Sequence, residues 1–189
     1  MSVLAACTTS GLDDASPDEV SRAAYVPVGP PSLTVFTIVN NTSGAGGHSS
    51  LMVSGSQQVI FDPAGSFRLE ELPERGDVLY GVSPGWVAAY KSAHARETYH
   101  VVSQTFVVTP QQAETALALV KAHGPAPDAF CANATSSILR QVPGFEDVKT
   151  TFYPVKLMDQ LDKRPDVMKE KYFEDDEGNI TDGIVAYQG

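Results

Sequence analysis

HSSLMVSGSQQVIFD, residues 48–62, has the pattern of two short strands joined by a tight turn. The turn falls at residues 54–57, and the Pro-Ala-Gly of residues 63–65 ends the second strand. In an antiparallel pair closed by a short turn, the start of the first strand and the end of the second lie close together. We therefore predict that His48 and Asp62 are neighbours in the folded protein.

The sequence on either side of this hairpin predicts further strands and helices. Two runs rich in β-branched residues, 33–39 and 99–108, are typical of strands. Helices are predicted after Ser83-Pro84 towards His94, after Thr109-Pro110 as far as Gly124-Pro125, from Cys131 to about Gln141, and from Val155 to Leu161. Strands in the middle with separate helices around them indicate an α+β domain rather than βαβ repeats.

Composition indicates one globular domain in a chain of 189 residues, of which 42% are hydrophobic and 19% charged. The net charge of −10 and the scattered basic residues argue against nucleic acid as a partner. Residues 8–32 are rich in Thr, Ser, Asp, Pro and Gly, so we expect a flexible linker there and a folded domain over 33–189. The four histidines are spread singly, so we expect neither a metal site nor a cofactor.

The two cysteines have different surroundings. Cys7 follows Leu4-Ala5-Ala6, which resembles the lipobox at the end of a bacterial lipoprotein signal, although the charged and apolar regions of such a signal are missing. The resemblance implies that residues 1–7 end a signal, that Cys7 carries a lipid, and that the protein is held at the bacterial cell envelope by that anchor alone. A disulfide through Cys7, to Cys131 or to a second copy, is the alternative, although disulfide frameworks favour Cys-rich secreted chains.

Cys131 is the candidate nucleophile, because the predicted helix begins at it. Unpaired N–H groups and the dipole at a helix start favour a thiolate, and the same groups can bind an oxyanion. A free cysteine that only packs in the core is the alternative. His48 suits the role of base, and Asp62 is the candidate to orient its ring, although Asp before Pro-Ala-Gly is also an ordinary turn residue.

Other polar residues are weaker candidates. His94 and His123 are expected near helix ends, in contact with solvent, and His100 lies in a predicted strand as a core or pocket residue. Asn40, Asn41 and Gln104 are candidate hydrogen-bond donors to a ligand; the sequence does not rank them.

Three segments, 47–53, 59–62 and 130–140, resemble permuted papain-like proteins. This branch of the NlpC/P60 superfamily includes the lecithin-retinol acyltransferase-like proteins. The resemblance covers roughly residues 33–160 and implies an antiparallel sheet packed against helices, with the nucleophile at a helix N-terminus. It also implies that Cys131 is the nucleophile, His48 the base and Asp62 the third polar residue.

The same resemblance implies a function. We expect a monomeric thiol hydrolase of the cell envelope, of cysteine peptidase or amidase type, that cleaves an amide bond in a peptidoglycan stem peptide or a similar peptide. Two alternatives stay open. The residues that follow Cys131 depart from the family pattern, which favours a non-catalytic envelope lipoprotein with a papain-like ligand-binding domain. A lipid-directed acyltransferase or esterase is the other.

Overall fold

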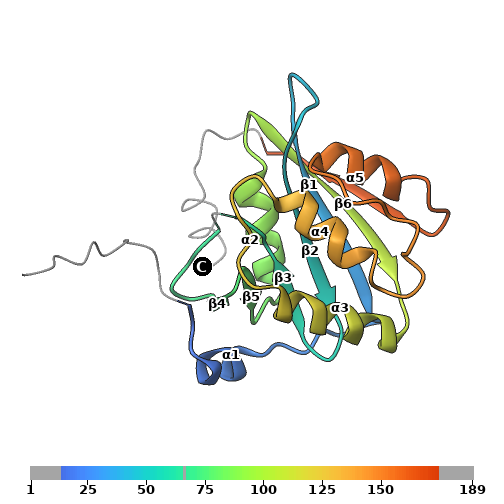
Figure 1. Ribbon diagram of the computed structural model, residues 1–189. Helices are drawn as coiled ribbons and strands as arrows, with labels where there is room; N and C mark the ends of the chain where they lie inside the picture. The colour runs from blue at the N-terminus through green and yellow to red at the C-terminus, as the bar shows by residue number, and fades with distance from the viewer. Residues whose placement is uncertain (1–13, 66, 175–189) are drawn as a thin grey trace, which may run out of the picture.

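The structure, a computed structural model, describes residues 14–65 and 67–174 and has the α+β architecture that the sequence predicts (Figure 1). The strands within these residues are β1 (Ser32–Asn40), β2 (Gly46–Ser54), β3 (Gln58–Phe61), β4 (Glu74–Arg75), β5 (Val78–Tyr80), β6 (Tyr99–Val107) and β7 (Met168–Tyr172). The helices are α1 (Pro17–Ala23), α2 (Pro84–His94), α3 (Pro110–His123), α4 (Cys131–Leu139) and α5 (Pro154–Leu161).

All the strands form one antiparallel sheet in the order β4-β5-β3-β2-β1-β6-β7. The predicted hairpin is confirmed as β2 and β3, which pair from Ser54 with Gln58 to Leu51 with Phe61. Because β3 ends at Phe61, the first half of β2, residues 46–50, has no β3 partner. The functional side chains collect beside this stretch, which pairs with β1 alone.

Helices cover both faces of the sheet, so every residue of β1 from 33 to 39 is buried. Leu33 and Val35 face the core shared with α3, α4 and α5, the three helices that lie in front of the strands in Figure 1. Phe36 and Ile38 face a second core that is closed by α2. Successive side chains of a strand point to opposite faces of the sheet. A strand that is covered on both faces therefore does not alternate between buried apolar and exposed polar residues.

The segment expected to be a flexible linker, 8–32, differs from that expectation in its described part, 14–32. It contains α1, which begins with a capping box in which Ser16 and Glu19 bind each other's backbone N–H groups. The Ala15 N–H also donates to the Glu74 carbonyl at 2.7 Å, which fixes the segment to the body of the domain. The expectation of a linker rested on the average composition of the segment, which carries no information on local contacts. The Ser-x-x-Glu spacing of residues 16–19 is the local pattern that indicates a helix start.

Several short elements were not predicted. The edge strands β4 and β7 and the neighbouring β5 have two to five residues each, too few to show a periodic pattern. Among the described residues, no helix has the length and apolar character that a membrane crossing needs. Cys7 and the sequence that resembles a lipobox lie outside the described residues.

Candidate active site

The structure brings His48 and Asp62 together, as the hairpin predicts. His48 lies in the half of β2 that pairs with β1 but not with β3, and Asp62 directly follows β3. The Nε2 atom of His48 lies 2.7 Å from Oδ1 of Asp62. The Asp62 side chain is buried, and only 15% of the His48 side chain is exposed. The ring is therefore held by one nitrogen, which leaves Nδ1 for a second partner.

Cys131, the first residue of α4, lies close enough to His48 for the thiol and the imidazole to shift each other's pKa. No side chain caps α4, so the N–H groups of its first turn are free to bind the sulfur. The N–H groups of Ala132 and Ser49 lie close enough to the sulfur to lower the pKa of the thiol. Ser49 can donate outward because β3 has already ended at this point of β2.

Two local features place α4 against β2. Ala129, two residues before the thiol, has a φ of 66°, a left-handed conformation that is costly for a residue with a Cβ. This turn directs the chain into the helix at Phe130. One turn after the thiol, the Thr135 hydroxyl lies 3.4 Å from the carbonyl oxygen of Ser49 and so ties the helix to the strand that carries His48.

The electrostatics of the three groups favour a thiolate–imidazolium pair. Burial opposes charge on His48, but the carboxylate of Asp62 outweighs it, with help from Cys131, and raises the pKa of His48 to about 10. Burial likewise raises the pKa of the Cys131 thiol, but the hydrogen bond and charge of His48 and the two backbone N–H groups together lower it below its usual value. For Asp62, burial is outweighed by His48, so the pKa of this carboxyl is lowered and it stays ionised.

Two residues of α2 complete the site, and the sequence did not single them out for it. The Tyr90 hydroxyl donates to Asp62 Oδ1 at 2.6 Å and lies 2.8 Å from the Ser50 hydroxyl. His94, expected in solvent at a helix end, is instead partly buried, with its ring stacked on that of His48 at 6.0 Å between centroids. Burial lowers the pKa of His94, so a neutral imidazole lies beside the charged one.

The other polar candidates lie elsewhere. His100 Nδ1 lies 2.7 Å from Asn41 Oδ1, and the His100 ring stacks on Phe173. Asn40 accepts hydrogen bonds from its own loop, and Gln104 donates to Asp162 at 2.6 Å. None of these contacts involves Cys131 or His48.

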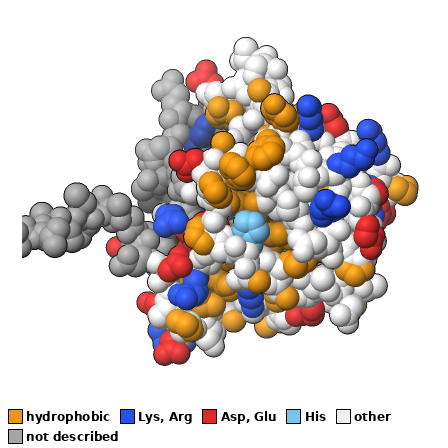
Figure 2. Space-filling view, in the orientation of Figure 1, with side chains coloured by type: hydrophobic (Ala, Val, Ile, Leu, Met, Phe, Trp, Pro, Cys, Tyr) orange, Lys and Arg blue, Asp and Glu red, His pale blue; other side chains and the backbone are white. Residues whose placement is uncertain are grey.

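Cys131 is largely buried beside an exposed aromatic pair. Cys131 is 8% exposed, whereas Phe130 beside it is 39% exposed and packs edge-on against Phe152, with 5.0 Å between the ring centroids. Hydrophobic side chains gather on this face over the start of α4 (Figure 2). An extended apolar segment of a ligand can therefore lie against the two rings while it approaches the thiol.

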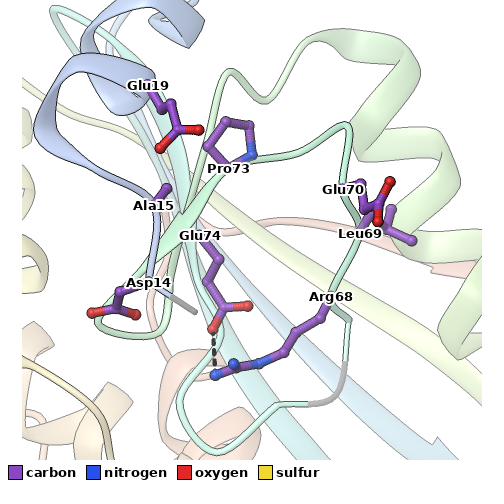
Figure 3. Close-up of a pocket in the computed structure, with 8 residues that line it drawn as sticks. All are labelled: Asp14, Ala15, Glu19, Arg68, Leu69, Glu70, Pro73 and Glu74. Carbon is purple, nitrogen blue, oxygen red and sulfur yellow. Dashed lines mark ion pairs between the residues drawn. The ribbon is translucent and has the colours of Figure 1, made fainter. Parts of the chain in front are cut away.

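A separate cavity lies between α1 and the chain that leads into β4 (Figure 3). It contains an ion pair of 3.0 Å between Arg68 and Glu74, and burial raises the pKa of Glu74 to about 7. Its lining includes neither Cys131 nor His48.

Comparisons with protein-family models, with curated proteins and with solved structures found no match. Across residues 14–65 and 67–174, no three His, Cys, Asp or Glu side chains converge in a way that could hold a metal ion. Fold and site together define an α+β protein in which a histidine lies between a buried aspartate and a cysteine at a helix N-terminus.

Proposed function

We propose that this protein is a thiol hydrolase that cleaves an amide bond, with Cys131 as nucleophile, His48 as acid and base, and Asp62 as the group that holds His48. One observation carries the proposal: the imidazole of His48 is bound to the Asp62 carboxylate at 2.7 Å and lies beside the Cys131 thiol, whose pKa it lowers. The same side chains occur on unrelated folds wherever a nucleophile must be ionised near neutral pH.

The geometry supports a two-step reaction. The Cys131 thiolate attacks the amide carbonyl carbon, and the resulting oxyanion lies near the free N–H groups at the start of α4. The His48 imidazolium gives its proton to the leaving nitrogen, the C–N bond breaks, and a thioester remains. A water molecule then attacks the thioester while His48 accepts its proton, and the C–S bond breaks to release the acid and the thiolate.

The finer assignment rests on the resemblance in sequence. The order His48, Asp62, Cys131 along the chain, on an antiparallel sheet packed with helices, supports a permuted papain-like protein. We extend the proposal to an amide in a peptidoglycan stem peptide or a similar peptide as substrate. With Cys7 acylated, the domain would work at the bacterial cell envelope.

The proposal is tested by the rate at which iodoacetamide alkylates Cys131 between pH 5 and pH 10, in a Cys7→Ser background that leaves one thiol. A thiol with an ordinary pKa near 8.5 is less than about 1% ionised at pH 6. Because His48 lowers the pKa of Cys131, the thiolate persists as the pH falls below neutrality. We expect alkylation at pH 6 to be at least about tenfold faster than in His48→Ala, whose profile moves to higher pH.

His123→Ala is the matched control, since His123 is an exposed histidine outside the site. It should alkylate like the parent protein. Equal and slow alkylation in all three proteins would contradict the hydrolase and favour a papain-like domain that only binds its ligand.

A further inference from the structure

A basic groove with a volume of about 580 Å³ runs between α5 and the chain that precedes it. Its lining consists of Asp147, Lys149, Thr150, Thr151, Lys156, Gln160, Lys163 and Arg164. Figure 2 shows basic side chains gathered over α5, next to the hydrophobic surface at the start of α4. In a chain with a net charge of −10, such a concentration of cations is a local exception.

The charges of this basic groove are largely unneutralised. Arg164 pairs with Asp147 at 2.8 Å, and Asp147 is the single carboxylate of the lining. Among the described residues, no carboxylate lies within ion-pair distance of the ammonium groups of Lys149, Lys156 or Lys163. Three like charges around one concave surface attract an anion more strongly than any of them does alone.

The groove adjoins the helix that carries the candidate nucleophile. The Thr151 N–H donates to the Ser136 hydroxyl at 3.1 Å, so the loop that forms one wall lies along α4. The next residue, Phe152, contacts Phe130, which directly precedes Cys131. A ligand that extends from the sulfur across these two rings therefore arrives at Thr151 and the lysines.

We propose that the groove binds a carboxylate on the acyl part of the substrate, so that the enzyme acts on acidic peptides. This inference rests on the proposed function. The Phe130–Phe152 pair then guides the apolar segment between the scissile carbonyl and the carboxylate. Lysines are mobile point charges, and the guanidinium of Arg164 is already engaged, so the site selects charge and distance rather than a planar, bidentate geometry.

The test uses p-nitrophenyl monoesters of the diacids succinate, adipate, suberate and sebacate, each compared with the ester whose free carboxylate is capped by methyl. Cys131 displaces p-nitrophenolate, and water then releases the diacid from the thioester. We expect the ratio of kcat/KM for the charged over the capped ester to reach about tenfold at one chain length and to fall with added salt.

Two double variants test whether the lysines of the groove cause this preference for the charged ester. In Lys149→Gln/Lys156→Gln the ratio should fall close to one. Lys121→Gln/Lys171→Gln removes the same charge from exposed positions elsewhere and should keep the ratio. A ratio near one for every chain length in the parent protein would overturn the groove as a substrate site, even if the capped esters are cleaved.

A binding measurement separates this inference from the proposed function. Free suberate should shift the amide NMR signals of residues 149–156 in the parent protein and not in Lys149→Gln/Lys156→Gln. If these shifts occur while no ester is cleaved and alkylation is slow, the hydrolase is refuted and the anion site stands. If no signal shifts, the anion site is refuted whatever the activity.

Discussion

Asp62 Oδ1 accepts two hydrogen bonds at once, from His48 Nε2 and from the Tyr90 hydroxyl. Burial and the charge of Asp62 raise the pKa of Tyr90 well above its ordinary value, so the phenol keeps its proton and remains a donor. Two donors from different elements therefore hold the same carboxylate oxygen. We infer that Tyr90 positions Asp62 and acts on Cys131 only through His48.

Tyr90→Phe tests this positioning role. The variant keeps the ring contacts with Phe36 and Phe67 and loses the bond to Asp62. We expect the free energy of unfolding in urea to fall by about 1–3 kcal/mol, because a buried charged acceptor loses a donor. Alkylation of Cys131 at pH 6 should also slow, which a purely structural role would not cause.

Tyr25→Phe is the control, since no hydrogen bond of its phenol is found among the described residues. Unchanged stability and unchanged alkylation in Tyr90→Phe would show that Asp62 needs no second donor.

At this scale the sequence predicts contacts that depend on local geometry and misses those that depend on distant packing. His48 and Asp62 are joined by one short turn, so strand pairing alone places them together. Tyr90 contacts the same carboxylate from α2, a helix that is separated from Asp62 by 28 residues of sequence. Its position depends on how α2 packs on the sheet, which no local pattern contains.

The loop that follows β3 packs against the side chain of Asp62. Gly65 donates its N–H to the Asp62 carbonyl at 2.9 Å, and its backbone passes close to the Asp62 side chain. A Cβ at Gly65 would lie 1.8 Å from Asp62 Oδ2, much closer than atoms can approach. The sequence shows Pro-Ala-Gly only as a strand end; the structure shows that the glycine leaves room for the carboxylate.

Gly65→Ala should therefore disturb the site directly. We expect a loss of about 1–3 kcal/mol in the free energy of unfolding and a shift of the Cys131 alkylation profile towards higher pH, because the displaced carboxylate no longer holds His48. Gly85→Ala is the control: it lies at the start of α2, and the nearest atom to its Cβ would be at an ordinary 3.7 Å. If Gly65→Ala and Gly85→Ala have the same stability and the same alkylation profile, the loop accommodates the added methyl group without displacing Asp62, which would contradict this prediction.

Helices were predicted well where periodicity extends over several turns. The helix predicted after Thr109-Pro110 is confirmed as α3, and its apolar residues at helical spacing are buried: Ala113, Ala116, Leu117 and Val120. By contrast, β7 has the sequence MKEKY and four exposed residues, so neither hydrophobicity nor alternation marks it. It forms because β6 presents a free edge to pair with.

At the scale of the molecule, the sheet formed by the described residues ends in β4 on one side and β7 on the other, and both edge strands are protected. β4 has two residues, and β7 carries three consecutive charged residues, Lys169, Glu170 and Lys171. Short edge strands and edge charges are the usual means by which proteins prevent pairing between copies. We therefore predict that the protein is a monomer, which also agrees with its large net charge.

Lys169→Val/Lys171→Val should weaken this protection. The variant gives β7 a β-branched edge and should associate at concentrations where the parent protein sediments as a monomer, as measured by sedimentation velocity. Lys121→Val, which adds an exposed apolar residue on α3 and away from any edge, is the control. A dimer in the parent protein, or a monomeric double variant, would contradict this account of the edges.

The contact between the first half of β2 and the start of α4 means that the thiol is reactive only once the chain has folded. In the unfolded ensemble Cys131 has no imidazole beside it and behaves as an ordinary cysteine. Native protein should therefore be labelled faster than denatured protein at mildly acidic pH, the reverse of what a half-hidden cysteine normally shows. A reagent pulse during refolding would then time the arrival of α4 at β2, and a newly made chain would carry no active sulfur until the second half of the domain has closed over the first.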